Sequence, residues 1–269
     1  MSTVFDRWRH AGAWLWTGLV LAYLIVPLLV IVPMSLTSGT MLTLPTPGWS
    51  LRWYEIVLTD PRWLSSLVNS LIVGIGSTAL AAALGIPAAI GLAWGRFPGR
   101  GLAMAIIATP IVLPIVVLGV AAFSFYASIG LVGSRLSLVL AHAGLAAPIV
   151  LTTVMASLQS FDRSLMRAAA SLGAPPGTAF RRVLLPLIWP GVAAGALIAF
   201  VISFDEIVIA SFLTTAAQRT LPRQIFSGVR ESINPAIAAV AVLLVAMSGA
   251  VLAATLLLQR QQSKYRLRP

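Results

Sequence analysis

Cysteine is absent from this 269-residue sequence, and charged residues make up only 9% of it. The lack of cysteine excludes a disulfide framework and a thiolate metal site. The shortage of charge argues against a soluble domain, in which about 25% of the residues are charged. Because 59% of the residues are hydrophobic, most of the surface must face lipid or other helices in lipid. The composition therefore predicts a membrane protein.

Catalytic motifs are also missing. The sequence has no H-E-x-x-H zinc motif, no G-x-S-x-G nucleophile motif and no G-x-x-x-x-G-K-[ST] loop for nucleotide phosphates. Its single lysine is Lys264. These absences argue against an enzyme, and we expect no metal ligands and no cofactor bound to this chain.

Six long apolar runs are present, each near or above the ~20 residues that cross a bilayer as a helix. They are continuously apolar and do not alternate, which is typical of helices and not of barrel strands. Prolines inside these runs, Pro114 among them, are expected to kink the helices without ending them. The predicted fold class is an all-α integral membrane protein with six transmembrane helices. The predicted helices cover residues 11–34, 66–94, 101–126, 136–158, 184–213 and 236–258.

The basic residues predict the orientation of the chain. With the N-terminus inside, 12 of the 18 arginine and lysine residues fall in inside segments and six fall outside, which places both termini in the cytoplasm. The first apolar run is longer than the core of a signal peptide and is expected to remain as a helix, with a cleaved signal peptide as the alternative. The predicted organisation is a lead, first helix and external loop (1–60), a five-helix core (61–260) and a cytoplasmic tail (261–269).

The long inside loop, residues 159–183, has a pattern of its own. Residues 163–172 are rich in helix formers, with Ser160 or Asp162 as a candidate cap. Gly173 can take a positive φ that ends the helix, and the two prolines that follow prevent its continuation. A second helical turn is expected to begin after Gly177 or Thr178. The alternative is a basic amphipathic loop that rests on lipid headgroups.

The spacing in this loop resembles the EAA loop of type I, binding-protein-dependent ABC importer permeases. That pattern is Glu-Ala-Ala, three residues, Gly, nine residues, Ile or Val, one residue and Leu-Pro. The sequence departs from it at the first place, where Arg167 stands for the usual Glu. The resemblance implies a coupling helix that docks on an ATPase subunit. The residues assigned to docking on this basis are Arg163, Arg167, Ala168, Ala169, Gly173, Val183, Leu185 and Pro186.

Two further stretches, residues 203–209 and 221–236, resemble permeases of spermidine/putrescine importers. The resemblance implies a polyamine or related cation as solute and alternating access as mechanism. It also implies four kinds of partner: a second homologous permease, two ATP-binding subunits that hold ATP and Mg, an extracytoplasmic solute-binding protein and the lipid of a bacterial inner membrane. No nucleic-acid partner is expected. The alternatives are a permease for another small organic solute and a stand-alone channel or secondary transporter.

Two carboxylates in the fifth apolar run are candidates for the solute path. Acidic residues within a membrane helix are costly and usually face a bundle interior, a water-filled path or a basic partner. Adjacent residues on a helix point about 100° apart, so Asp205 and Glu206 are expected to have different roles. Ser203 joins them as a tentative path residue. The open alternative is structural pairing with an arginine of the same outer side: Arg219, Arg223 or Arg230. His142 is expected to be a satisfied interior histidine and not a metal ligand.

Overall fold

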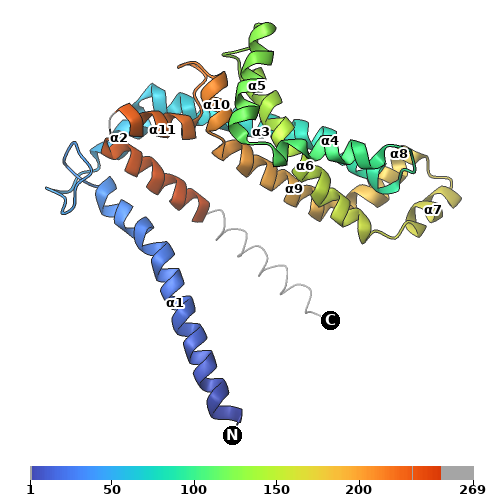
Figure 1. The fold of residues 1–269 in the computed structure, drawn as a ribbon, viewed down its shortest axis with the longest axis horizontal. Coiled ribbons are helices and arrows are strands. Elements are labelled where there is room, and N and C mark those ends of the chain that lie inside the picture. Colours follow the sequence, from blue (N-terminus) through green and yellow to red (C-terminus); the bar gives the residue numbers. More distant parts are fainter. Residues whose placement is uncertain (1, 232, 250–269) are drawn as a thin grey trace. The chain divides into compact units, whose positions relative to one another are not determined.

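The computed structural model describes residues 2–231 and 233–249 of the chain. These residues form helices joined by loops, and within them the only strand-like feature is an isolated bridge between Thr37 and Trp49. Contacts divide the chain into two compact units, residues 62–226 and residues 1–61 with 227–269. Figure 1 shows the order of the elements along the chain. The domain boundaries expected from the sequence stay a prediction.

The larger unit contains most of the helices. Its two longest helices are α3 and α6, and a π-helical turn, η1, leads into α9. The elements from α3 onward are α3 (Pro61–Trp94), α4 (Arg100–Val112), α5 (Ile115–Ser128), α6 (Arg135–Gln159), α7 (Ser164–Ser171), α8 (Pro176–Ala179), η1 (Phe180–Leu184), α9 (Leu185–Asp205), α10 (Val208–Leu213) and α11 (Leu221–Glu231).

The smaller unit contains α1 (Ser2–Ser35), α2 (Arg52–Thr59) and a helix at Pro235–Gly249. The hydroxyls of Ser35 and Tyr54 lie 2.6 Å apart and link the end of α1 to α2. The indole of Trp53 donates to the carbonyl of Gly39 (3.2 Å), so the loop after α1 is tied to the same short helix.

Within the described residues, four helices are long and apolar enough to cross a membrane, or five spans if one bent pair of helices crosses as a unit. The prediction of one continuous helix at residues 101–126 is wrong, because α4 and α5 meet at a bend of 104°. Leu113 is extended there (ψ 142°), since the residue before a proline avoids the helical region and Pro114 has no N–H to donate.

Two other predicted runs differ from the structure at their ends. The helix expected at 184–213 ends at Asp205, and α10 follows as a separate short helix. The sixth run is helical as far as Gly249, and the rest of that prediction, residues 250–258, lies outside the described residues.

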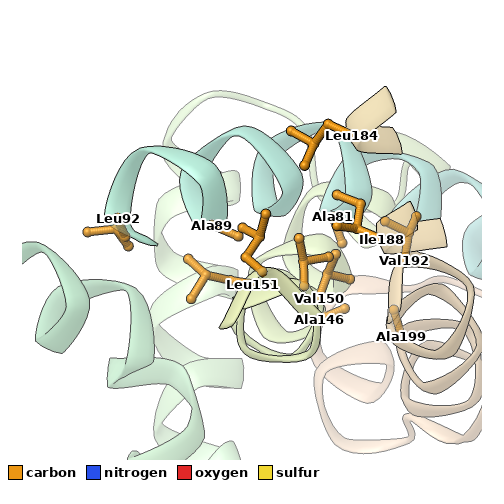
Figure 2. Packing of buried hydrophobic residues seen from close by; sticks show 12 residues of the cluster. Ala81, Ala89, Leu92, Ala146, Val150, Leu151, Leu184, Ile188, Val192 and Ala199 are labelled. Atoms are coloured by element: carbon orange, nitrogen blue, oxygen red, sulfur yellow. The ribbon is translucent and has the colours of Figure 1, made fainter. Parts of the chain in front are cut away.

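The core of the larger unit forms where α3, α6 and α9 lie side by side (Figure 1). Figure 2 shows alanines and branched aliphatic residues of these helices meeting in one cluster. Small residues allow the close approach: a Cβ on Gly191 or Gly195 would collide with Ser157 or Thr153 of α6. This packing fixes α9 against α6, and so fixes the end of α9 where the acidic residues lie.

Candidate functional site

The candidate solute site lies at the break between α9 and α10. Glu206 has an extended backbone (φ −73°, ψ 121°) and ends α9. Its side chain turns back onto α10, where Oε1 accepts from the amide of Ile209 (2.8 Å) and Oε2 from the amide of Ala210 (2.9 Å). A carboxylate at this position satisfies orphan amides and complements the positive end of the helix. The side chain of Glu206 therefore caps the free amides at the N-terminal end of α10, whose N-cap position is Ile207.

A buried chain of polar side chains runs from Glu206 into the helix bundle. Oε2 of Glu206 lies 3.4 Å from Nε2 of His142, and Nδ1 of His142 lies 2.9 Å from Oγ of Ser203. Ser203 contacts the hydroxyl of Ser77 at 2.7 Å, and Ser77 donates to the carbonyl of Val73. All four side chains are buried. The chain connects α3, α6 and α9 to α10, and buried polar networks of this kind specify one arrangement of the elements that they join.

Asp205, the residue before Glu206, has a different environment. Its side chain is exposed, and it has no hydrogen-bond or ion-pair partner among the described residues. It lines a hollow of about 400 Å³ whose other walls are mainly aliphatic, including Ile115, Val201 and Val208. An unpaired carboxylate over an apolar wall is suited to a cation that carries an aliphatic chain.

The arginine-pairing alternative has no support within the larger unit. Arg219 donates to the side chain of Gln224 (3.2 Å), and Arg223 donates to the carbonyl of Thr214 (2.5 Å). The partner of Glu206 is His142, which the sequence identified as an interior histidine without indicating its contact. The connection of Ser77 and Ser203 to the same chain was also missed. The feature of the sequence that could have indicated these contacts was the presence of polar residues in three otherwise apolar runs.

The predicted loop between the fourth and fifth runs contains a helix and a bend. Asp162 caps α7: Oδ1 accepts from the amide of Ser164 (2.8 Å), and Oδ2 from its hydroxyl (2.5 Å). These two hydrogen bonds, with the side-chain bond as the larger cause, lower the pKa of the Asp162 carboxyl below its usual value. Of the two candidate caps named from the sequence, Asp162 is therefore the one that caps α7.

The bend after α7 is confirmed at Gly173, which has φ +78°. The amide of Gly173 bonds to the carbonyl of Ala170 (2.9 Å) and that of Ala174 to Ala169 (3.0 Å), the pair of bonds that defines a Schellman C-terminus. The helix restarts at Pro176, slightly earlier than expected, because proline is well suited to a first helical turn.

The docking residues expected from the sequence lie along this segment. Arg167 and Ala168 are exposed on α7, while Ala169 is buried. Val183 lies in η1, and Leu185 and Pro186 begin α9. Arg163 donates to the carbonyl of Ala93 (3.0 Å) at the end of α3. The segment is therefore anchored to the bundle, and its docking role stays a prediction.

Apolar spans, an interrupted helix with a buried polar chain and an anchored helical loop define a membrane subunit of a transporter. The chain belongs to the family of binding-protein-dependent transport system inner membrane components, whose model matches residues 81–266. It is thus a permease subunit of an ABC importer, as the sequence predicted.

The chain is similar to two permeases of Escherichia coli strain K12. It is 35% identical over 253 residues to the putrescine transport system permease protein PotI, covering 91% of this chain and 90% of PotI. It is 28% identical over 245 residues to the spermidine/putrescine transport system permease protein PotC, covering 91% and 92%.

Its fold is that of a chain from a bacterial ABC transporter involved in the import of the acidic polysaccharide alginate. The TM-score is 0.73 at 18% identity, covering 94% of this chain and 96% of the other. The likeness confirms the all-α, type I ABC permease fold.

Proposed function

We propose that this chain forms part of the translocation path for a polyamine such as putrescine or spermidine, or for a related cationic compound. The observation that carries the proposal is Asp205, an exposed carboxylate without a partner in the described part of the chain, beside an aliphatic hollow. An ammonium group can bind the carboxylate while methylene groups contact the wall. The identity to permeases named for putrescine and spermidine supports the same solute class.

The two adjacent carboxylates divide the work in this proposal. Glu206 is held by two backbone amides and lies against His142, so it maintains the helix break. Asp205 has its oxygen atoms free for the solute. Ser203, a tentative path residue from sequence, is buried and bonded to His142; it belongs with the supporting chain and not with the surface that meets the solute.

The transport cycle is alternating access, driven by ATP on partner chains. A second homologous permease completes the path, two ATP-binding subunits hold ATP and Mg, and an extracytoplasmic solute-binding protein delivers the solute. The family assignment supports this set of partners. ATP binding favours one of two arrangements of the complex and so shifts their populations. The proposed topology is six spans in the inner membrane with both termini in the cytoplasm.

The segment 159–183 is proposed as the coupling loop. Leu165 of α7 and Leu172, the residue directly after this helix, are exposed, the latter by 89%. Exposed apolar side chains are suited to a groove on another protein. Anchorage through Arg163 and the fixed bend at Gly173 make the segment a rigid connection from an ATPase to α9.

Uptake of labelled putrescine and spermidine tests the proposed solute. The measurement compares cells that carry the whole transporter with cells that lack only this chain. We expect uptake to depend on the chain. If uptake is the same in both, the polyamine assignment fails while the permease class stands, and the neighbouring binding protein becomes the protein to screen for ligands. Co-purification of an ATP-binding subunit with the chain tests the coupling proposal separately.

A further inference from the structure

A polar cavity lies far along the bundle from the helix break, at the end that carries α7. It has a volume of about 200 Å³ and is lined by residues from the end of α3, the start of α4 and the end of α6 with the loop that follows. Two arginines, Arg100 and Arg163, line it together with the amide side chain of Gln159. No acidic residue is among the lining residues in the described chain. Asp162, the nearest in sequence, is engaged with Ser164.

Trp94 gives this cavity a built wall. The guanidinium of Arg163 lies over its ring, 5.2 Å from the centroid, and Phe161 packs on it with the ring centroids 5.8 Å apart. The indole N–H of Trp94 is buried and has no hydrogen-bond acceptor among the described residues. A buried donor without a partner costs free energy unless a ligand or water accepts from it. Arg163 uses one of its donors on the carbonyl of Ala93 and has others left.

Helix α4, whose first residue Arg100 lines the cavity, also exposes apolar side chains. Leu102 and Ile106 are one helical turn apart on α4, which Arg100 begins, and their side chains are 66% and 63% exposed. Residues four apart lie on the same face of a helix. A polar pocket with cationic donors at the start of a helix that exposes aliphatic side chains offers the two parts that a phospholipid needs: a place for the phosphate and an apolar surface for an acyl chain.

We propose that this cavity is a binding site for the headgroup phosphate of an anionic phospholipid such as phosphatidylglycerol. Arg100 and Arg163 bind the phosphate oxygens, the indole of Trp94 supplies a further donor, and the acyl chain lies along Leu102 and Ile106. Tryptophan and arginine at a helix end match the depth of lipid headgroups. A lipid held here stabilises the contact between α3 and the loop that begins α7.

Native mass spectrometry of the purified whole transporter tests the site. The complex is exchanged into lipid-free detergent and titrated with phosphatidylglycerol, with phosphatidylcholine or with inorganic phosphate. The variants are R100Q and W94F. The matched control is R96Q, because Arg96 is an exposed arginine in the loop between α3 and α4, four residues before Arg100, and does not line the cavity.

We expect wild type and R96Q to retain phosphatidylglycerol equally, R100Q to bind it about tenfold more weakly, and W94F to bind it several-fold more weakly. A tenfold weaker affinity corresponds to the loss of one charge-assisted contact. If R100Q does not assemble, W94F decides the question, since phenylalanine keeps the aromatic packing and removes only the N–H donor.

Three results would overturn the proposal. Equal lipid retention by R100Q and R96Q would show that the cavity is not the site. Displacement of the lipid by inorganic phosphate at equal concentration would assign the cavity to a free ion. A cross-link from position 100 to an acidic residue of an ATP-binding subunit, with no retained lipid, would assign it to a protein contact.

Discussion

Nε2 of His142 lies 3.4 Å from Oε2 of Glu206, and this contact joins α6 to the break between α9 and α10. The same carboxylate caps α10, while the other nitrogen of the imidazole contacts Ser203 on the last turn of α9. One histidine therefore touches the chain on both sides of the break. Because Asp205 is the last residue of α9, directly before this break, the geometry around His142 determines how that carboxylate is presented.

Replacing His142 separates its hydrogen bonding from its volume. H142L removes both polar contacts and leaves a buried carboxylate with fewer partners, which costs about 1–3 kcal/mol. H142Q keeps an amide that can contact both Ser203 and Glu206. We expect H142L to lower the melting temperature of the purified complex and to reduce uptake, and H142Q to recover most of both.

The matched control for this comparison is S211A. Ser211 is an exposed residue of α10 whose hydroxyl bonds only to the carbonyl of Ile207 (2.7 Å). The S211A variant is expected to leave the melting temperature and the uptake unchanged. Equal melting for H142L and wild type would contradict the supporting role of the histidine.

Asparagine at position 205 tests the solute contact. D205N keeps the size of the side chain and removes its charge, so we expect the KM for a cationic solute to rise about tenfold, since a charge-assisted contact contributes roughly 1.5–3 kcal/mol. Assembly of the complex should be unaffected, because Asp205 is exposed and has no partner among the described residues.

The neighbouring variant E206Q should behave in the opposite way. Glutamine has a single acceptor oxygen for the amides of Ile209 and Ala210, so a donor is left unsatisfied at the cap of α10. We expect loss of stability in thermal melting before any selective change in KM. A normal KM in D205N with poor assembly would favour a structural role for Asp205.

Through Asp162, the stability of α7 in the coupling loop is expected to fall at low pH. Its folded-state pKa is lowered by the hydrogen bonds from Ser164, so its contribution to the stability of α7 is fully present above the unfolded value of 3.8 and is lost as the pH falls through the lower folded value. At neutral pH the cap is intact.

A spin label can follow this transition, because the chain has no cysteine of its own and L172C gives one labelling site at the exposed end of α7. We expect the label mobility to rise only below about pH 4. In S164A the rise should begin at a higher pH, because the larger cause of the lowered pKa is removed. Identical curves for the two proteins would refute the cap.

The sequence predicted the elements whose signals are local. Apolar runs gave the long helices, and the spacing of Gly173 and the prolines gave the bend after α7. Pro114 shows where local reasoning stops: Pro87, Pro110 and Pro148 lie inside helices, yet the chain breaks at Pro114. Whether a proline ends a helix in a bundle depends on neighbours that can satisfy the freed carbonyls, and these neighbours are distant in sequence.

The candidate site was predictable in composition but not in arrangement. Acidic residues in an apolar run identified Asp205 and Glu206. The apolar pattern continues beyond them through Leu213, so it gave no signal that the helix ends at this point. The partner of Glu206 comes from α6, and tertiary contacts of this kind do not follow from periodicity along one helix.

Valine at position 173 tests the bend in the coupling loop. Gly173 has φ +78°, a conformation that costs a β-branched residue roughly 1–3 kcal/mol. A Cβ would meet no atom within 4 Å, so the effect of G173V is conformational and not steric. We expect ATP hydrolysis in the complex to continue while uptake per ATP falls several-fold, because α7 no longer meets α8 at the required angle.

Two matched variants isolate the conformational effect in this experiment. G173N should retain most of the uptake, because asparagine tolerates a positive φ better than valine does. G177V places the same side chain four residues later, at a glycine of α8 that has no positive φ and equally open surroundings. If G177V lowers coupling as much as G173V does, added bulk on the loop is the cause and the bend is not. If G173V alone lowers it and G173N restores it, the left-handed turn at Gly173 transmits the motion.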